Sequence, residues 1–249
     1  MIKLSDHSTK PPKGYDKKAI KKATDEITEK IQELQLMMYA EKKHSLLIVF
    51  QGMDSSGKGG ATRNVFAKCS PAEVNVKSFK KPTDEEFAHD FLWRIHKHAP
   101  AKGMIQVFDR SHYEDVLIQR VHGWISEEHC DKRIAAINAW EELLQFDNNT
   151  TILKFYMHLS QERQQEKLKE RLADPRKNWK HNDGDWEEAK LWDKYRESYE
   201  NVINKCTVPW IIAPVDSRTY RNYFISKKVL ETLESFDMSW PLVTESKYA

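Results

Sequence analysis

The sequence predicts an α/β fold in which a five-stranded parallel sheet lies between two layers of helices, with a helical lid at one end. Apolar runs of strand length alternate with amphipathic helical stretches along the chain, as in a parallel sheet covered on both faces. A glycine-rich turn also follows the first of these strands. With 249 residues, of which 39% are hydrophobic, the chain is long enough for one sizeable domain and short for two. We therefore expect a single domain over residues 1–249.

The elements of the first half follow from composition and local signals. Residues 1–15 contain two prolines and a glycine, which predicts an extended arm that wraps the body or a partner subunit. Large apolar residues recur on one face of a helix over 19–40, and the unbroken apolar run from Leu46 to Phe50 indicates a strand buried on both faces. Thr83 and Glu86 have the spacing of a capping box. The other elements expected here are a helix over 58–69, a strand over 74–79, the capped helix over 83–99 and a strand over 104–108.

The second half continues the alternation of helix and strand. Apolar residues at helical spacing predict a helix over 127–147, and a strand over 150–157 follows it. A helix over 161–173 ends before Pro175. The helix over 185–204 leads to a strand over 208–215, whose two prolines stand near its ends, where a sheet tolerates them. An amphipathic helix over 220–233 completes the fold.

The turn after the first strand has the spacing of a phosphate-binding loop. Gly52, Gly57 and Lys58 form Gly-x-x-x-x-Gly-Lys after a buried strand and before a helix, and in this setting backbone N–H groups hold phosphate oxygens. Glycine permits positive φ and a close approach of the backbone to an anion, while Lys58 neutralises phosphate charge. The alternative is a glycine-rich turn that only joins a core strand to a core helix, and the strand context argues against it.

This loop departs from its common form at one position. Gly59 stands where Ser or Thr usually provides a hydroxyl ligand to Mg²⁺, so another oxygen must coordinate the ion. Asp54 is the first candidate, because a carboxylate among phosphate-binding amides needs a cation to offset the repulsion. Ser55 or Ser56 could provide the ligand instead.

A second acidic residue, Asp109, ends the strand over 104–108. An acid at the carboxyl end of a parallel strand lies in the crevice where open α/β sheets bind ligands, and beside a phosphate-binding loop it would hold Mg²⁺. The alternative is a helix cap. The polar residues that follow favour a site, because few cores need so much polarity in one turn; they are Arg110, Ser111, His112, Tyr113, Glu114 and Asp115.

A basic segment follows the fourth strand and the helix after it. The window over 171–181 contains Arg171, Arg176, Lys177, Lys180 and His181, with one acid. On its own, such a run is most often a solvated helix face. Because phosphotransferases commonly carry a basic lid in this connection, which closes over phosphates and excludes water, we predict a lid over about residues 171–190.

Composition limits the classes of function. A charged fraction of 31% with a net charge of +2 argues against a surface that coats nucleic acid. The three cysteines are isolated in sequence, which indicates a reducing compartment, and no apolar run has the length of a signal peptide or a membrane span. We therefore expect a cytoplasmic protein without nucleic-acid or membrane partners. A module that binds nucleic acid through the lysines and tryptophans of 171–186 is the alternative.

Together these features predict a site for phosphoryl transfer. The loop amides and Lys58 hold a phosphate, Asp54 and Asp109 hold Mg²⁺, and Arg110 with the basic segment neutralises the negative charge that develops. Catalysis of this kind consists largely of alignment and electrostatic stabilisation. Direct transfer is therefore the simplest mechanism, and His112 as a phosphoryl carrier is the alternative.

Five motifs in order resemble those of a known family. They are Gly-Met-Asp-Ser-Ser-Gly-Lys-Gly-Gly at 52–60, Ser-Phe-Lys at 78–80, Phe-Leu-Trp-Arg-Ile-His at 91–96, Phe-Asp-Arg-Ser-His-Tyr-Glu-Asp-Val at 108–116 and Asp-Pro-Arg-Lys-Asn-Trp-Lys at 174–180. With these motifs the chain resembles the polyphosphate kinase 2 family from about residue 10 to residue 233. The resemblance implies a thymidylate-kinase-like P-loop core with a helical lid, and reversible phosphoryl transfer between inorganic polyphosphate and nucleotides. It also implies Mg²⁺ as cofactor, with Mn²⁺ as a substitute, and a homo-oligomer.

The resemblance implies roles for individual residues. Asp54 and Asp109 match the metal-binding acids, although some relatives carry Asn at the second position, and Lys58 and Arg110 match the phosphate-clamping cations. Glu114 and Asp115 complete the expected catalytic set. The expected phosphate- and nucleotide-binding residues are Gly52, Met53, Ser55, Ser56, Gly57, Gly59, Arg63, Lys80, Lys81 and Arg94. The expected lid residues that face polyphosphate are Arg171, Arg176, Lys177 and Lys180.

The pair Glu114-Asp115 bears on the acceptor. Family members that mainly use nucleoside diphosphates tend to carry Asn-Arg after the matching Tyr, whereas the Glu-Asp form resembles the third class, which phosphorylates nucleoside mono- and diphosphates. We therefore expect conversion of AMP to ADP and of ADP to ATP, with guanine nucleotides as a second option. The alternatives are a polyphosphate kinase restricted to nucleoside diphosphates and an ATP-dependent nucleotide kinase. ATP as the donor does not require cations as widely spread along the chain as the phosphate-binding and lid residues named above.

Overall fold

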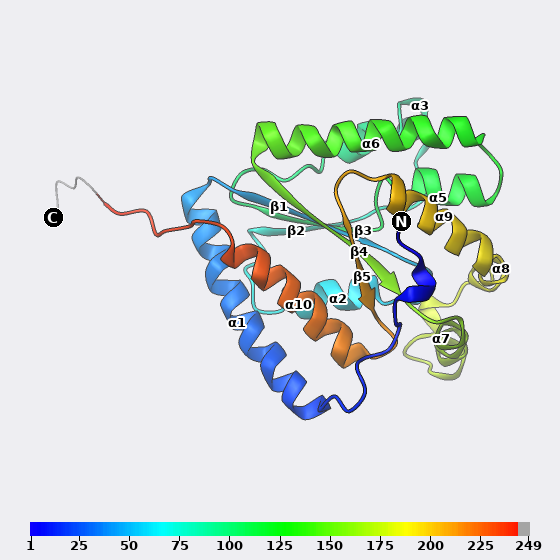
Figure 1. Cartoon of the computed structure of the whole chain (residues 1–249), viewed down its shortest axis with the longest axis horizontal. Coiled ribbons are helices and arrows are strands. Elements are labelled where there is room, and N and C mark those ends of the chain that lie inside the picture. Colours follow the sequence, from blue (N-terminus) through cyan, green and yellow to red (C-terminus); the bar gives the residue numbers. More distant parts are fainter. Residues whose placement is uncertain (244–249) are drawn as a thin grey trace.

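The computed structural model describes residues 1–243 and contains one sheet with the strand order β2-β3-β1-β4-β5 (Figure 1). All neighbouring strands are parallel, which confirms the predicted fold class. Each strand lies within two residues of its predicted bounds. The strands are β1 (Ser45–Gln51), β2 (Val74–Ser78), β3 (Ile105–Asp109), β4 (Thr150–His158) and β5 (Trp210–Pro214).

Helices cover both faces of this sheet and extend beyond its carboxyl edge. Within residues 1–243, no helix has the length and apolar composition that crossing a membrane would require. The helices are α1 (Lys17–Glu41), α2 (Lys58–Val65), α3 (Asp84–Ala88), α4 (Trp93–His96), α5 (Glu114–Val121), α6 (Glu127–Asn148), α7 (Gln161–Ala173), α8 (Gly184–Lys190), α9 (Trp192–Lys205) and α10 (Arg218–Glu234), with short 3-10 turns η1 (Leu4–Asp6) and η2 (Asn178–Lys180).

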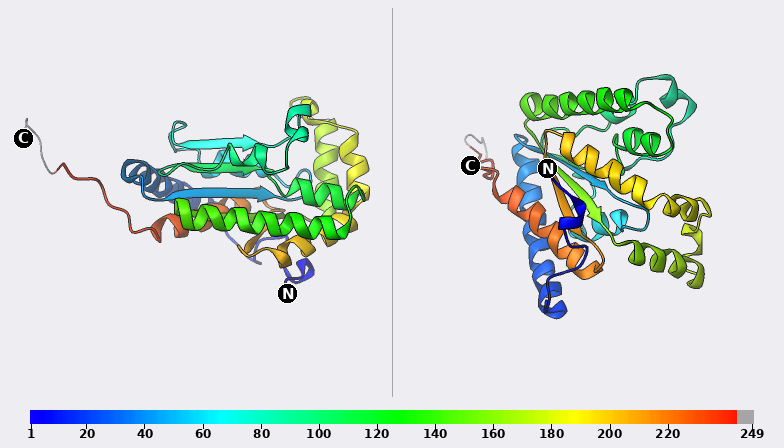
Figure 2. Two further views of the ribbon diagram at one scale, coloured as in Figure 1. Left: turned by 90° about the horizontal axis from the view of Figure 1, so that it is seen from above. Right: turned by 45° about the vertical axis from the view of Figure 1, so that its right-hand side comes forward.

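The central strand β1 is buried along its whole length and supplies both halves of the core. Leu47 and Val49 pack with residues of α5, α6 and α9, whereas Leu46, Ile48 and Phe50 pack with residues of α1, α2 and α10. Successive side chains of a strand point to opposite faces, so a continuous apolar run is what a doubly covered strand needs. Figures 1 and 2 show the two helical layers, with α7 and α8 beyond the carboxyl ends of the strands.

The helix predicted over 83–99 is wrong as a single element, because the chain forms two short helices there. The capping box of Thr83 and Glu86 is present and starts α3. The carboxylate of Asp90 then accepts hydrogen bonds from the backbone N–H groups of Leu92 and Trp93, which starts a new turn and breaks the helix. Phe87, an apolar residue of the predicted helix, is therefore 77% exposed.

Three other helical predictions also change. The helix that follows the phosphate-binding loop ends at Val65 rather than near residue 69, and the helix predicted over 185–204 is divided at Leu191 into α8 and α9. The predictions contain no helix over 114–121, where the structure has α5. The polar residues at the start of this helix give no apolar pattern from which its beginning could be predicted. Its later residues Val116, Leu117 and Val121 are buried on one face.

The N-terminal arm wraps its own domain. Leu4 is fully buried, and its backbone N–H donates to a carboxylate oxygen of Glu200 on α9 at 2.8 Å. Further along, the hydroxyl of Thr9 donates to Asp216 at 2.7 Å, and the hydroxyls of Tyr15 and Ser217 lie 2.9 Å apart. The arm thus runs from α9 to the start of α10.

Candidate active site

The loop between β1 and α2 has the backbone of a phosphate-binding loop. Gly57 has a φ of 90° immediately before α2, and a Cβ on Gly52 would lie 2.9 Å from the side chain of Met157, so both glycines are required. Lys58 is buried, and its Nζ donates to the carbonyl of Gly52 at 2.9 Å. Burial lowers the pKa of Lys58, while the carboxylate of Asp54 opposes this effect. The first-turn amides of α2 and a lysine therefore meet at the carboxyl end of β1.

Asp109 explains why this loop has glycine at position 59. A Cβ on Gly59 would lie 3.0 Å from Oδ2 of Asp109, so Ser or Thr at that position would crowd the carboxylate. Asp109 ends β3 opposite Phe50 of β1, which brings its side chain beside the loop. The carboxylate of Asp109 thus lies next to position 59, where most phosphate-binding loops have a Ser or Thr hydroxyl. Carboxylate and hydroxyl oxygens are both hard donors of the kind that Mg²⁺ prefers.

Asp54 and Arg110 form an ion pair, with Oδ1 and Nη2 2.8 Å apart. Arg110 has a φ of 63° and Ser55 a φ of 66°; the two other non-glycine residues with positive φ within residues 1–243 cap helices α1 and α6. Such conformations cost about 1–3 kcal/mol each and concentrate at functional sites. Burial lowers the pKa of Arg110, but the carboxylates of Glu114 and Asp54 outweigh it, so the net pKa is raised and Arg110 stays charged.

A cavity of about 870 Å³ opens above this loop, and we call it the phosphate cavity. Ten basic and four acidic side chains line it, which makes it a strongly electropositive site. Both predicted metal-binding acids line it. The predicted residues in its lining are Asp54, Ser55, Gly57, Lys58, Gly59, Arg63, Lys80, Asp109, Arg110, Arg171, Lys177 and Lys180.

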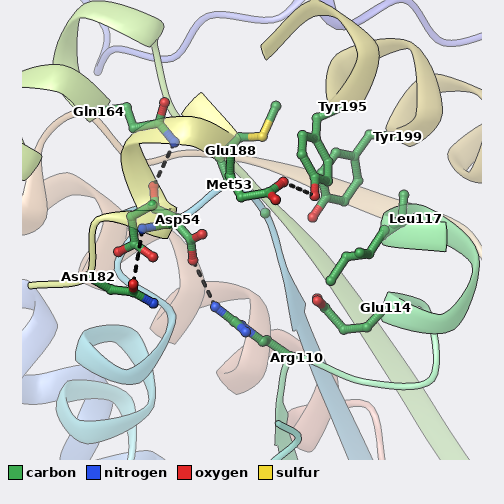
Figure 3. Close-up of a pocket in the computed structure, with 14 residues that line it drawn as sticks. Met53, Asp54, Arg110, Glu114, Leu117, Gln164, Asn182, Glu188, Tyr195 and Tyr199 are labelled. Carbon is green, nitrogen blue, oxygen red and sulfur yellow. Dashed lines mark hydrogen bonds and ion pairs between the residues drawn. The ribbon is translucent and has the colours of Figure 1, made fainter. Parts of the chain in front are cut away.

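A second cavity of about 340 Å³ adjoins the first, and we call it the acidic cavity. Asp54 and Arg110 line both cavities. The acidic cavity also contains the predicted residues Gly52, Met53 and Glu114. Figure 3 shows Glu114, Glu188 and Tyr195 around the same space, and the hydroxyl of Tyr195 donates to the carboxylate of Glu188 at 2.6 Å. The residues that sequence reasoning missed here are Leu117, Ile118, Gln164, Asn182, Gly184, Asp185, Glu188, Tyr195 and Tyr199.

The burial of Glu114 affects its charge. Desolvation raises the pKa of Glu114, while the guanidinium of Arg110 and the ammonium of Lys58 oppose the rise. Burial also raises the pKa of Asp185, with the Asp54 carboxylate as the next cause. These carboxylates thus share one region of limited solvation, where a hydrogen-bond donor or a cation would be favoured.

Asp115 and Arg94 are not at the site, which corrects two predictions. Arg94 Nη2 lies 3.1 Å from Asp115 Oδ2, and both side chains are more than nine-tenths buried. Arg94 also donates to the carbonyl of Lys80 at 2.9 Å and lies 3.6 Å from Glu86. A guanidinium held in this way by two carboxylates links α4 to α5, and neither Arg94 nor Asp115 lines the phosphate cavity or the acidic cavity.

Three further predicted residues lie outside both cavities. Lys81 is exposed beyond the phosphate cavity, and the side chain of Arg176 is 90% exposed and held by Asp174. Ser56 is fully buried beneath the loop. None of the three lines either cavity, so direct phosphate contacts by their side chains do not follow from this geometry.

His112 is inaccessible as a phosphoryl carrier. The ring is fully buried, with Trp140 and Tyr113 at centroid distances of 5.0 and 4.5 Å. Burial lowers the pKa of His112 even though Glu141 favours the charged form. The polar turn at 110–115 therefore divides into Arg110 and Glu114, which face the cavities, and neighbours that face the core.

The oxygen donors of the phosphate cavity fit Mg²⁺. Asp54, Asp109 and Ser55 line the same cavity, and the hydroxyl of Ser55 is buried without a hydrogen-bond partner. Among residues 1–243, no group of three or more His, Cys, Asp and Glu side chains could hold a metal on its own. Mg²⁺ commonly takes one or two carboxylates and completes its shell with water and substrate phosphate. The donor set therefore suits an ion shared with a phosphate substrate.

Sequence reasoning missed three cations of the phosphate cavity, Lys167, Arg218 and Arg221. The first is on α7 and the others are on α10. Each belongs to a helix of mixed charge that is ordinary in sequence, and no motif marks it. The one available signal is position: these basic residues follow β4 and β5 in the chain, and ligands of open α/β sheets bind at the carboxyl ends of the strands.

A phosphate-binding loop after the central strand, an acid at the end of the neighbouring strand and a basic cavity define a P-loop phosphotransferase. The chain belongs to the polyphosphate kinase 2 family, whose family model matches residues 14–240. This confirms the resemblance inferred from the five motifs.

Individual relatives agree with this assignment. The chain is 42% identical over 228 residues to the AMP/ADP-polyphosphate phosphotransferase of Meiothermus ruber, which covers 90% of this chain and 85% of the relative. It is 37% identical over 234 residues to the ADP-polyphosphate phosphotransferase of Rhodopseudomonas palustris, covering 88% and 81%. The crystal structure of polyphosphate kinase 2 from Arthrobacter aurescens TC1 matches with a TM-score of 0.95 at 37% identity, covering 99% of this chain and 90% of that chain.

Proposed function

We propose that the protein transfers the terminal phosphoryl group of inorganic polyphosphate to nucleoside mono- and diphosphates, converting AMP to ADP and ADP to ATP in a reversible reaction. The excess of cations in the phosphate cavity, ten basic against four acidic side chains, carries this proposal. The phosphates of a single nucleotide do not require so many cations, whereas a long polyanion does. The relative from Meiothermus ruber is named for both AMP and ADP, which supports both acceptors.

The two adjoining cavities suit two different substrates. The phosphate cavity would hold polyphosphate, and the acidic cavity would hold the nucleoside of the acceptor. Tyr195, Tyr199 and Leu117 supply aromatic and apolar surface for a base, and Glu188 and Asp185 can accept hydrogen bonds from hydroxyl or amino groups. The acceptor phosphates would then lie beside Arg110, where the cavities meet.

Mg²⁺ would be held by Asp54 and Asp109, with a hydroxyl of Ser55 as a further oxygen donor. Bound there, the ion would neutralise phosphate oxygens and orient the substrates. Mn²⁺ would substitute, because it shares the preference for carboxylate and water oxygens.

The residues of this chain would promote transfer by position and charge. The loop amides and Lys58 hold the phosphoryl group of the donor, and Arg110 neutralises charge on that group as it moves to the acceptor. The 2.8 Å ion pair with Asp54 fixes the direction of the Arg110 guanidinium. Direct transfer is the simplest route, and the full burial of His112 supports it by arguing against this residue as a carrier.

The test is incubation of the protein with Mg²⁺, polyphosphate and one of AMP, ADP, GMP or GDP, followed by chromatographic separation of the nucleotides. We expect ADP and ATP to form with polyphosphate as the sole donor. Lys58→Ala should lower turnover about 10²–10³-fold, since a preorganised charge is lost from the transition state, while circular dichroism shows a retained fold. Near-normal turnover of this variant would contradict the assigned role.

The same assay separates the alternatives. Phosphorylation of ADP without phosphorylation of AMP would indicate a kinase restricted to diphosphates. Phosphorylation of AMP by ATP but not by polyphosphate would indicate an ordinary nucleotide kinase and would overturn the proposal.

We also propose that the protein works in the cytoplasm as a homo-oligomer. All three cysteines are free of disulfides, which suits a reducing compartment. Light scattering of the purified protein measures the number of subunits.

A further inference from the structure

Lys167 and Arg221 are buried cations beside the phosphate-binding loop, and neither is paired with a carboxylate among residues 1–243. Lys167 is 8% exposed and Arg221 is 4% exposed. Their nitrogens donate to loop carbonyls, from Lys167 to Ser55 at 3.2 Å and from Arg221 to Gly57 at 3.1 Å. A Cβ on Gly57 would overlap the guanidinium of Arg221, so the arginine lies directly against the loop.

The pKa values of these two side chains are consistent with uncompensated charge. Burial, followed by the nearby cations Arg221, Arg163 and Arg218, lowers the pKa of Lys167 to about 8. Burial and the neighbouring Arg218 lower the pKa of Arg221 to about 10. Buried charges are costly unless they have a counter-ion, so this side of the loop favours an anion.

A third cavity of about 420 Å³, which we call the outer cavity, continues from this point. Glu170, Lys177 and Arg218 line both the outer cavity and the phosphate cavity, so the two are neighbours. Lys17, Arg163 and Thr219 line the outer cavity and not the phosphate cavity. The outer cavity therefore extends a basic surface away from the phosphate-binding loop.

The acids of the outer cavity do not cancel its cations. Among the described residues, four basic side chains line it, Lys17, Arg163, Lys177 and Arg218, against the two acids Glu170 and Asp216. Asp216 keeps its charge and accepts hydrogen bonds from the backbone N–H of Ser160 at 2.9 Å and from the hydroxyl of Thr9 at 2.7 Å. Glu170 is shared by three cations from three segments. The distances are 3.5 Å to Arg163, 3.3 Å to Lys177 and 3.4 Å to Arg218. Arg163 also pairs with Glu166 at 2.6 Å and Lys177 with Asp174 at 3.5 Å, whereas Arg218 has no other acid within ion-pair distance among residues 1–243.

We propose that the polyphosphate chain leaves the active site through the outer cavity, between α7 and α10. This rests on the proposed function. The phosphates nearest the reacting end contact Lys167 and Arg221, the next ones pass Arg218 and the first turn of α10, and later ones reach Arg163 and Lys17. Chains that end inside the phosphate cavity do not reach these last two residues, so Lys17 and Arg163 favour long polyphosphate over short.

The experiment compares two double variants with the same charge change. The test variant, Lys17→Gln with Arg163→Gln, removes two cations of the outer cavity. The control variant, Lys22→Gln with Lys169→Gln, removes two cations from the same helices, α1 and α7, that line neither the outer cavity nor the phosphate cavity. Saturating ADP is combined with long-chain polyphosphate or with tripolyphosphate. For the test variant we expect the KM for long chains to rise about two- to thirtyfold, as for two solvent-exposed charge contacts. Its KM for tripolyphosphate and for ADP should stay unchanged, as should all values of the control variant.

Equal KM values for long chains in the two variants would overturn the path, and so would an equal loss for long chains and tripolyphosphate. Calorimetric binding of long-chain polyphosphate without nucleotide gives a readout independent of turnover. If the wild type binds long chains but transfers nothing, the proposed function fails, and the path is still decided by the affinity difference between the variants. If the wild type binds no polyphosphate, both fail.

Discussion

Lys167 is a buried lysine whose pKa is lowered to about 8 by burial and by neighbouring arginines, so its charge changes within the range where enzymes are assayed. A lysine is charged below its pKa. As the pH rises through about 8, Lys167 loses its charge, and we expect kcat/KM for polyphosphate to fall, because this ratio reports ionisations of the free enzyme. Lys167→Arg keeps the charge and should remove most of the fall. The measurement is kcat/KM against pH for both proteins.

Unfolding would not explain such a fall. The pKa of Lys167 is lower in the folded protein than in the unfolded chain, so between about pH 8 and pH 10 the unfolded chain binds more protons and this residue makes the fold more stable as the pH rises. An identical pH profile in wild type and Lys167→Arg would show that another group is responsible.

Glu114 belongs to the acidic cavity beside Arg110, and we expect it to help AMP more than ADP. AMP lacks one phosphate, so a carboxylate that holds a water molecule or a metal ion could keep the shorter acceptor in register. Glu114→Asn should therefore lower kcat/KM for AMP about tenfold more than that for ADP, within the range of a lost hydrogen bond to a charged group. An unchanged AMP-to-ADP ratio would remove the proposed role.

Single residues were predictable where a motif fixes their environment. The spacing of Gly52, Gly57 and Lys58 defined the loop, and Asp109 followed from its place at the end of a strand. Arg94 and Asp115 were misplaced because two charged residues in active-site-like motifs can pair with each other across 21 positions, and a sequence does not show that. Lys167 on α7 and the arginines on α10 were not predicted, because they are far apart in the sequence and lie beside the phosphate-binding loop only in the folded chain.

At the scale of elements, the basic segment after α7 gives a prediction. Lys177 and Lys180 line the phosphate cavity, whereas Arg176 does not. Lys177→Gln with Lys180→Gln should raise the KM for polyphosphate about tenfold and change the KM for ADP little, because two phosphate contacts are lost at the edge of the site. Initial rates at varied polyphosphate and at varied ADP measure the two effects.

The control removes the same charge from the predicted lid over residues 171–190. Arg176→Gln with Lys190→Gln affects two largely exposed side chains, at 90% and 68%, and neither lines the phosphate cavity. The hydrogen bonds from Arg176 lower the pKa of Asp174 to about 2, so Arg176 is already held by an acid. A comparable effect of the two double variants would mean that the segment attracts polyanions only through its net charge.

Elements were predictable where one signal dominates. The apolar run of β1 and the proline after α7 gave bounds close to the observed ones. The region over 83–99 failed because Asp90 offers a local side-chain partner to the backbone, which competes with a continuous helix. The helix α5 was missed because polar site residues occupy its first turn, although its later residues are buried.

At the scale of the whole molecule, alternation of strand and helix predicted a parallel sheet but not its order. The order β2-β3-β1-β4-β5 places β1 between β3 and β4, so the loop after β1 meets Asp109 from one neighbour and, through α7, Lys167 from the other. The acidic and phosphate cavities therefore meet at the carboxyl end of the central strand, as expected for open α/β sheets. Their common boundary is a consequence of this order.

A buried ion pair links the sheet, one helical layer and the active-site turn. Lys154 on β4 and Glu141 on α6 are both fully buried, with Nζ and Oε2 2.6 Å apart. The hydroxyl of Tyr113, in the turn before α5, accepts from Lys154 at 2.7 Å and donates to Glu141 at 2.8 Å. The sequence does not predict this contact, because the partners of Lys154, Glu141 and Tyr113, are 13 and 41 positions away from it.

Removing one member of this pair should cost more than removing both. Lys154→Met leaves the carboxylate of Glu141 buried without its cation, and we expect the free energy of unfolding to fall by about 3–5 kcal/mol. Lys154→Met with Glu141→Leu leaves no buried charge at this point and should recover most of that loss, since a well-packed apolar pair often replaces a buried ion pair without penalty. Urea denaturation of the two single variants and the double variant measures the coupling. If the two single losses simply added, Lys154 and Glu141 would not be energetically coupled, and the ion pair would contribute nothing to holding α6 against the sheet.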